Sequence, residues 1–277
     1  MTENNPPFGT FAPTAFEQSV RRFTHRLPHN YVGRKLASLC LGPAGGRSGG
    51  PRDVSIFGDQ KARLHPYDNI SEKRVFVTPQ FWDPRERATL AGLIRTAAGP
   101  VTFLDVGANA GLYALFARSA AAQAGVDFRA LCIEPAPDML ARIRFNIAAS
   151  GANAEITVSP FGVADAASVK RFSVNSDSRG MTRLDDKGSE SFECKPLLQL
   201  MDEASIDRAT AMKIDIEGAE TAVLQAFFEA APEARRPRHI FIEVAHAPEA
   251  ADLLRRYGYR EIFSNRQNGV YASPDAA

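Results

Sequence analysis

The chain of 277 residues is 44% hydrophobic and 23% charged, with a net charge of +1. These values are ordinary for a globular protein with a sizeable core, and the near-neutral charge argues against nucleic-acid binding as its main activity. No run of 18 apolar residues is present, so we expect no transmembrane segment. The three cysteines lie far apart, and the first residues lack the features of a signal peptide. We therefore expect a cytoplasmic protein.

Residues 1–52 are predicted to form a tail, a helical segment and a linker. The polar, Pro-rich start is expected to lack fixed structure, and Gly42 to Pro51, rich in Gly and Pro, predicts the linker. Apolar residues at helical spacing run through 16–41, with a break at Pro28, beside a basic face. This segment has two interpretations. Its basic face could contact a membrane surface, or it could be the solvated side of a helix packed on the protein, which is the more ordinary case.

Residues 53–98 are predicted to form a β and helical extension. Short β segments are expected at 53–57, 61–64 and 74–79, followed by a helix at 85–98.

Residues 99–273 alternate between β and α patterns, which predicts a Rossmann-like α/β domain with a doubly wound, mostly parallel sheet. Expected strands lie at 101–106, 130–134, 154–159, 211–214 and 239–244, and expected helices at 112–122, 138–149, 197–204, 219–230 and 248–257. A β segment at 168–174 precedes an expected surface loop at 175–191. The chain is predicted to end in an antiparallel hairpin of strands 259–263 and 270–273, turning at Asn268-Gly269.

A glycine turn follows the first expected strand of this domain. It comprises Asp105, Gly107, Asn109 and Gly111, directly before a helix. Strand, glycine turn and helix present backbone N–H groups to a small ligand, and Asn is the residue besides Gly that best tolerates positive φ. The spacing departs from G-x-G-x-x-G, which argues against a nicotinamide dinucleotide. A turn without any ligand remains the structural alternative.

Glu134 ends the second strand of the domain, about 20 residues after the turn. A carboxylate at this place accepts both hydroxyls of a ribose. Glu134 could instead cap the helix that follows. Together, the turn and the acid favour a ligand that contains adenosine.

The segment K-I-D-I-E-G-A-E brings polar residues to the end of the fourth strand. By alternation, Lys213, Asp215 and Glu217 share one side, while Ile214 and Ile216 take the other. Ligands of doubly wound folds bind at the carboxyl ends of such strands. One acid, Glu217 or Glu220, could alternatively cap the next helix.

Glu243 and His246 end the fifth strand, next to this group in the expected sheet. His accepts protons near neutral pH, and a carboxylate can orient it. These residues, with Asp215 and Glu217, could also bind a divalent metal, but their spacing does not require one, and no metal is predicted.

The chain resembles the FkbM family of S-adenosylmethionine-dependent methyltransferases in a series of motifs, which in order are D-V-G-A-N-A-G-L-Y, I-E-P, F-G-V-A-D, K-I-D-I-E-G-A-E and I-E-V-A-H. The preceding H-P-Y-D-N-I and F-W-D-P, and the R-G-M-T-R-L loop, also match, so the resemblance covers about residues 53–272. Trp82-Asp83 stands where the family often has an aromatic residue and Glu. The tract 185–190 is a second departure.

This resemblance implies an S-adenosylmethionine cofactor and O-methylation of a hydroxyl on a sugar, glycan, lipid or other secondary metabolite. Asp105, Gly107, Asn109 and Gly111 would surround the methionine portion and Glu134 the ribose. The adenine would lie against Phe161 and Gly162, and the sulfonium near Asp215.

We hypothesise that His246 or Asp215 acts as the general base, with Glu217 and Glu243 orienting the acceptor or the base. A non-catalytic cofactor-binding module and an NAD(P)-dependent oxidoreductase are the alternatives.

Overall fold

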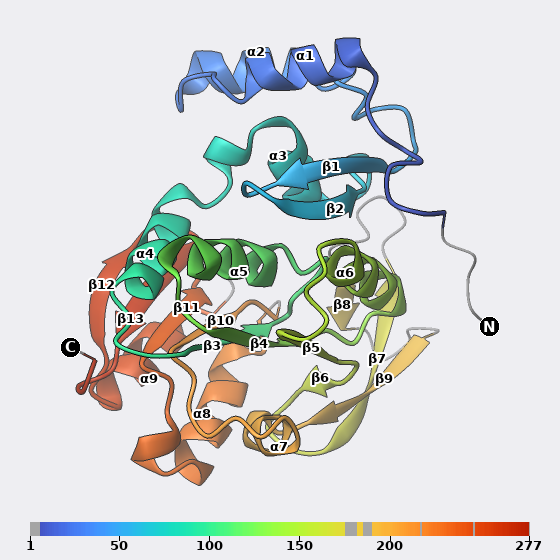
Figure 1. The fold of residues 1–277 in the computed structure, drawn as a ribbon. Helices are drawn as coiled ribbons and strands as arrows, with labels where there is room; N and C mark the ends of the chain where they lie inside the picture. Colours follow the sequence, from blue (N-terminus) through green and yellow to red (C-terminus); the bar gives the residue numbers. More distant parts are fainter. Residues whose placement is uncertain (1–5, 175–181, 185–189, 217, 246, 277) are drawn as a thin grey trace.

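A seven-stranded sheet forms the centre of the computed structural model, which describes residues 6–174, 182–184, 190–216, 218–245 and 247–276 (Figure 1). The strand order is β12-β13-β11-β10-β3-β4-β5, and only β13 runs against the others. These strands are β3 (Val101–Val106), β4 (Phe128–Ile133), β5 (Ile156–Ser159), β10 (Ala211–Ile214), β11 (His239–Glu243), β12 (Arg260–Ser264) and β13 (Asn268–Ala272). The predicted Rossmann-like, doubly wound sheet with a C-terminal antiparallel hairpin is confirmed.

Helices cover both faces of this sheet (Figure 1). Those on one face are α4 (Pro84–Arg95), α5 (Leu112–Ala124) and α6 (Pro137–Ala149), and those on the other are α7 (Leu197–Glu203), α8 (Glu220–Ala230) and α9 (Glu249–Arg256). Because strand residues alternate, Phe103 packs in one buried cluster with α5 and Leu104 in another with α8. Each face of the sheet thus has its own core.

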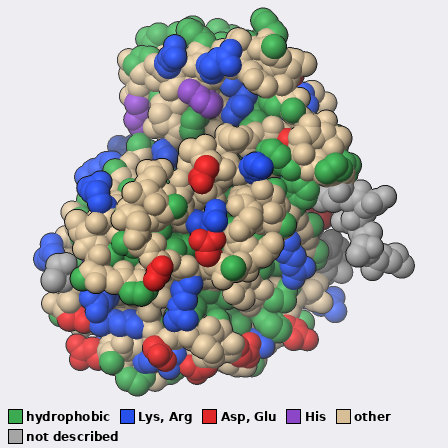
Figure 2. Space-filling view, in the orientation of Figure 1, with side chains coloured by type: hydrophobic (Ala, Val, Ile, Leu, Met, Phe, Trp, Pro, Cys, Tyr) green, Lys and Arg blue, Asp and Glu red, His purple; other side chains and the backbone are tan. Residues whose placement is uncertain are grey.

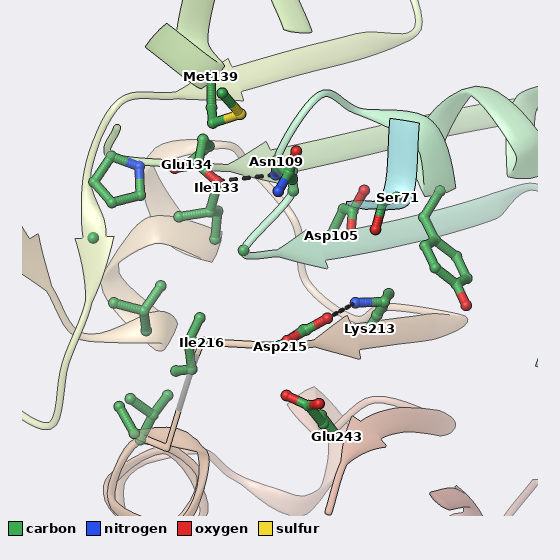
Figure 3. A pocket seen from close by; sticks show the side chains of 18 of the residues that line it. Ser71, Asp105, Asn109, Ile133, Glu134, Met139, Lys213, Asp215, Ile216 and Glu243 are labelled. Atoms are coloured by element: carbon green, nitrogen blue, oxygen red, sulfur yellow. Dashed lines mark hydrogen bonds and ion pairs between the residues drawn. The ribbon is translucent and has the colours of Figure 1, made fainter. Parts of the chain in front are cut away.

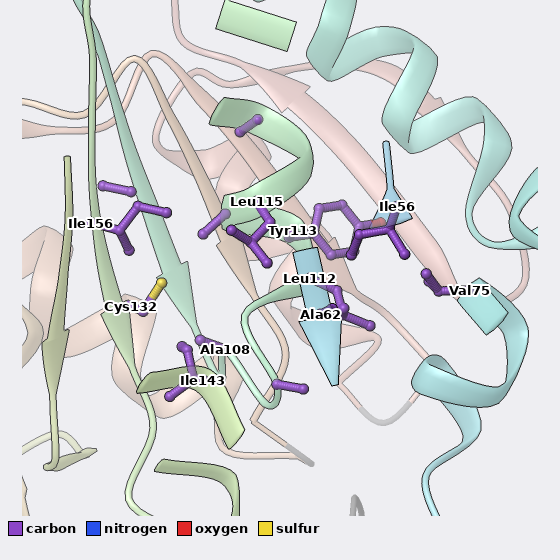
Figure 4. Close-up of a cluster of buried hydrophobic side chains, with 14 of the residues drawn as sticks. Ile56, Ala62, Val75, Ala108, Leu112, Tyr113, Leu115, Cys132, Ile143 and Ile156 are labelled. Carbon is purple, nitrogen blue, oxygen red and sulfur yellow. The ribbon is translucent and has the colours of Figure 1, made fainter. Parts of the chain in front are cut away.

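The N-terminal region adds two layers above α5 and α6 (Figure 1). The inner layer contains the hairpin β1 (Arg52–Ile56) and β2 (Gln60–Leu64), α3 (Ile70–Val77) and the short helix η1 (Pro79–Phe81). The outer layer consists of α1 (Ala15–Thr24) and α2 (Tyr31–Cys40). Ile56 and Val75 share a buried cluster with Leu115 of α5 (Figure 4). The division at residue 99 stays a prediction, and this core crosses it.

Buried ion pairs join these layers. The guanidinium of Arg142, on α6, binds Asp68 at 2.8 Å and Glu72 at 2.6 Å. Arg63, on β2, binds Asp53, on β1, at 2.8 Å. The Arg142 pairs fix the inner layer against α6, and the Arg63 pair joins β1 to β2 within that layer.

The expected strand at 74–79 is wrong, because residues 74–77 belong to α3. The side chain of Asn69 accepts a hydrogen bond from Glu72 N and starts this helix. Val75, Phe76 and Val77 are all buried, since packed layers surround this segment. Three successive apolar residues look β-like when only their sequence is considered.

Two segments expected to be unstructured are packed. Gly9 N and Phe11 N donate hydrogen bonds to the carboxylate of Asp53, so the prediction of disorder is wrong for residues 6–14. Residues 1–5 lie outside the described part. In the Gly- and Pro-rich segment 42–51, Ala44 is fully buried in the core cluster, so this segment is a packed connection.

A second, small sheet follows β5, in the order β6-β9-β7-β8. Its strands are β6 (Gly162–Val163), β7 (Ser168–Val174), β8 (Thr182–Leu184) and β9 (Glu190–Lys195). The expected loop 175–191 therefore contains β8 and the start of β9, while 175–181 and 185–189 lie outside the described residues. Asn268 and Gly269 begin β13 and do not form the turn. A further short helix, η2 (Glu233–Arg235), precedes β11.

Among the described residues, no helix is long and apolar enough to cross a membrane.

Candidate active site

The order of the sheet reverses between β3 and β10, and a cavity of about 650 Å³ lies at the carboxyl ends of these strands. Such a switch point is where doubly wound folds bind their ligands. The cavity wall includes Asp105, Asn109, Glu134, Asp215 and Glu243, which come from four different strands or the turns that follow them (Figure 3). The tertiary structure therefore brings these predicted residues together.

The glycine turn has the conformation that its residues predict. Asn109 has φ 53° and Gly107 has φ 78°. A side chain at Gly107 would clash with the backbone carbonyl of Asp215, so this glycine allows β3 and β10 to approach each other. A Cβ at Gly111 would lie 2.6 Å from Ile143, and Gly111 does not line the cavity. The structural role of Gly111 is thus close packing of α5 against α6.

Asn109 also anchors the turn through its side chain. Its Oδ1 accepts hydrogen bonds from Ala110 N at 2.8 Å and from Asn69 Nδ2 at 2.7 Å. Asn69 lines the cavity and lies at the start of α3. Sequence reasoning assigned no role to Asn69, although the H-P-Y-D-N-I motif that contains it was the available signal.

Glu134 is buried in the cavity wall, and both of its oxygens accept backbone hydrogen bonds. Oε2 accepts from Asn109 N, drawn in Figure 3, and Oε1 from Ala136 N, each at 2.9 Å. Burial raises the pKa of Glu134 to about 7, against the lowering effect of these two bonds. The bond from Ala136 N closes the turn before α6, which has no side-chain cap, and the cavity position of Glu134 is compatible with a ligand.

A charged group lies between β3 and β10. Lys213 Nζ binds Asp215 at 2.8 Å and lies 4.9 Å from the centre of the Tyr113 ring (Figure 3). Burial alone would lower the pKa of Lys213, but the negative charges of Asp215 and Asp105 raise it above its ordinary value. The ammonium therefore stays charged and compensates the neighbouring acids.

Asp105 is the most buried acid of this group. Burial raises its pKa to about 6, while the charge of Lys213 lowers it. Its Oδ2 is buried without a hydrogen-bond partner among the described residues. A buried carboxylate oxygen of this kind is unfavourable unless a donor reaches it.

Glu220 and Glu243 lie close to Asp215, near the end of β10. The carboxylate oxygens of Asp215, Glu220 and Glu243 approach within 4.8 Å of one another, a spacing that could hold a metal ion. Glu220 also accepts hydrogen bonds from Ile216 N and Gly218 N, at 2.7 and 2.9 Å. Glu220 thus caps the turn before α8. The other two predicted residues, Glu217 and His246, lie outside the described residues.

Of the two residues predicted to contact the adenine, Gly162 lines the cavity and Phe161 does not. An added Cβ at Gly162 would lie 2.8 Å from Cys194 Sγ. Lys195 Nζ lies 3.7 Å from the centre of the Phe161 ring.

Asp83 and Tyr113 also line the cavity. The Tyr113 hydroxyl donates a hydrogen bond to Asp83 at 2.8 Å. Burial raises the pKa of Asp83, and the bond from Tyr113 opposes this shift. Sequence reasoning left the role of Asp83 open and missed Tyr113, although the G-L-Y end of the first motif was the available signal.

The family model described as "Methyltransferase FkbM domain" matches residues 105–261. No curated protein matches the chain.

Among solved structures, the chain is similar to methyltransferase FkbM from Methylobacillus flagellatus KT, at 17% identity and a TM-score of 0.43, covering 92% of this chain and 57% of that one. It is also similar to precorrin-6y C5,15-methyltransferase from Geobacter metallireducens GS-15, at 13% identity and a TM-score of 0.42, covering 68% and 86%. A third is an O-methyltransferase from Bacillus cereus in complex with SAH, at 11% identity and a TM-score of 0.41, covering 69% and 81%.

The segment that the family model matches makes up more than half of the 277 residues. It contains the glycine turn, Glu134, Asp215 and Glu243. The chain belongs to the FkbM methyltransferase family.

Proposed function

We propose that this chain transfers the methyl group of S-adenosylmethionine to a hydroxyl of a sugar, glycan, lipid or other secondary metabolite. The observation that carries the proposal is the convergence of Glu134, Asp215 and Glu243 on one cavity at the switch point of the sheet. The first acid suits a ribose, and the other two suit the acceptor.

The cavity residues fit the cofactor in two respects. The two oxygens of Glu134 match the two ribose hydroxyls, and the unpartnered Oδ2 of Asp105 suits the ammonium of the methionine portion. When bound, S-adenosylmethionine supplies a methyl group that its sulfonium has already activated. The protein therefore has to align the acceptor and take up its proton.

We assign the general base to Asp215 or His246. The Asp215 side chain is 38% exposed, lines the cavity and is bound to Lys213, so an acceptor hydroxyl can reach it. Glu243, at the end of the neighbouring strand, would orient the acceptor, and Glu217 the base or the acceptor. Proton transfer to a positioned base contributes about 10²- to 10⁴-fold to the rate.

Methyl transfer from labelled S-adenosylmethionine to a panel of hydroxyl compounds tests this proposal. Binding of S-adenosylhomocysteine, measured by thermal shift beside NAD(P), tests the cofactor independently of the acceptor. A shift with NAD(P) alone would refute the cofactor assignment. Binding of S-adenosylhomocysteine without any transfer would favour the non-catalytic module.

Substitutions then separate the two candidate bases. If Asp215 is the base, Asp215→Asn lowers kcat at least about 100-fold and leaves the affinity for S-adenosylhomocysteine unchanged. The matched control is Asp127→Asn, at the opposite end of the strands. Unchanged turnover of His246→Ala would remove His246 from this role. The cytoplasm as the compartment stays a prediction.

A further inference from the structure

A second cavity of about 870 Å³ adjoins the active-site cavity and is lined by positive side chains. Four basic residues define this cationic groove: Arg34 on α2, Arg47 in the connection to β1, and Lys73 and Arg74 on α3. The groove lies between the outer layer, α3 and the β12–β13 turn.

The two cavities are continuous. Arg74, Asp83, Gln267 and Asn268 line both of them. A ligand that reaches the carboxylates at the ends of β10 and β11 can therefore extend past Asp83 into the groove.

Two acids, Asp83 and Glu86, also line the groove, so four cationic side chains face two carboxylates there. Asp83 accepts a hydrogen bond from the Tyr113 hydroxyl. Glu86 is buried and accepts hydrogen bonds from the side-chain amides of Asn265 and Asn268. The four basic side chains form no ion pair with the described residues. The Arg47 guanidinium donates a hydrogen bond to the carbonyl oxygen of Ser38, at 3.4 Å.

Unpaired cations in a concave wall concentrate positive potential, and guanidinium groups match the geometry of phosphate oxygens. Resting on the proposed function, we propose that the cationic groove binds a phosphate or diphosphate group of a small-molecule methyl acceptor. The acceptor hydroxyl then lies in the adjoining cavity. The substrate class is a phosphorylated hydroxyl compound.

Inorganic pyrophosphate is the probe for this site. Its affinity for the full chain is measured by calorimetry at constant ionic strength, with the triple variant Arg34→Gln, Lys73→Gln, Arg74→Gln. The matched control is Arg22→Gln, Arg26→Gln, Lys35→Gln, which removes the same charge from exposed residues outside the groove. We expect at least a tenfold loss in the groove variant and less than a twofold change in the control.

Equal affinities in the two variants, or no binding to the wild type, would overturn the proposal. Binding of S-adenosylhomocysteine is measured in parallel, because it reports on the proposed function alone. If the groove instead bound a lipid headgroup, the protein would bind anionic vesicles and pyrophosphate would displace it from them. That result would also overturn the proposal.

A separate observation concerns the outer face of α1 and α2. Six large apolar side chains on these two helices are exposed, with exposed fractions from 38% to 73%; they are Phe16, Phe23, Tyr31, Val32, Leu36 and Leu39. In Figure 2, hydrophobic side chains follow the outer edge of this layer, with Lys and Arg side chains beside them. The basic side chains Arg22, Arg26 and Lys35 lie in solvent, as the ordinary interpretation has it, but these large apolar side chains are exposed as well.

The packing of α2 explains this orientation. Its inner side consists of small residues, Gly33 and Ala37, which are buried. A side chain at Gly33 would clash with the carbonyl of Pro28, so the connection to α1 lies directly against the helix. Val32, Leu36 and Leu39, at helical spacing, consequently face away from the protein.

The charge around this apolar face is positive. Arg22, Arg26 and Lys35 are exposed, and Glu17, the single acid of the two helices, is bound to Arg52. A second copy of the chain would bring like charges together, whereas an anionic bilayer offers both acyl chains and opposite charge. We infer that this face docks on an anionic membrane surface.

Flotation with phosphatidylglycerol vesicles, compared with phosphatidylcholine vesicles, tests this inference. The variant Val32→Gln, Leu36→Gln, Leu39→Gln is expected to lose at least tenfold in partitioning. Val169→Gln, an apolar residue 65% exposed on β7, is the control and keeps wild-type partitioning. Equal partitioning of the triple variant, or a dimer that this variant abolishes in sedimentation, would refute membrane docking.

Discussion

Replacing Glu134 with Gln should remove the loss of stability that the ligand-free protein suffers as the pH rises toward 7, and should weaken cofactor binding. Burial raises the pKa of Glu134 from 4.5 to about 7. Between these values the folded state holds a proton that the unfolded state has released, so stability falls as pH rises through this window. At 1.36 kcal/mol per pKa unit, the loss is about 3 kcal/mol.

Gln is neutral at every pH, so the variant avoids this loss, but its amide nitrogen cannot accept one of the two backbone hydrogen bonds that the Glu134 oxygens accept, which costs about 1–3 kcal/mol. Below pH 4.5 the variant should therefore be less stable than the wild type by this amount. Between pH 4 and pH 8 the stability of the variant relative to the wild type should rise by about 3 kcal/mol, or about 5 °C in Tm for a chain of this length. Denaturant unfolding from pH 4 to pH 8 measures this difference.

Cofactor binding should change in the opposite direction. Gln has one acceptor oxygen, so one charge-assisted bond to the ribose is lost, which costs about 1.5–3 kcal/mol. Calorimetry with S-adenosylhomocysteine should therefore show a Kd about 10- to 100-fold higher at pH 8. An unchanged Kd would show that Glu134 does not bind the ribose. The argument from burial would be refuted if the wild type did not lose stability relative to the variant between pH 4 and pH 8.

Two further substitutions test how the site is supported. Gly107→Ala should destabilise the fold by more than about 2 kcal/mol, because the new Cβ would clash with a backbone carbonyl after β10. Gly125→Ala, at φ 68° with no atom near its Cβ, is the control and should cost only about 1 kcal/mol. Arg142→Met should cost about 3–5 kcal/mol, since it leaves Asp68 and Glu72 buried without their cation. Urea unfolding measures the stability of all three variants. A Gly107 variant as stable as its Gly125 control, or an Arg142 variant within about 1 kcal/mol of the wild type, would contradict these arguments.

Local sequence patterns by themselves determined the main sheet and the centre of the site. Alternation in K-I-D-I-E-G-A-E placed Lys213 and Asp215 on one side of β10, where they form an ion pair. The glycine turn after β3 predicted the positive φ of Asn109. These properties depend on the periodicity and dihedral preferences of a few adjacent residues, so they could be predicted without knowing the rest of the fold.

Only the tertiary structure decided what depends on contacts between distant segments. Val75, Phe76 and Val77 are helical because other layers cover them and Asn69 caps the helix. Leu36 faces outward because small residues fill the inner side of α2. A sequence pattern shows that residues share a face of an element, but the surrounding layers decide whether that face is buried, binds a ligand or meets solvent.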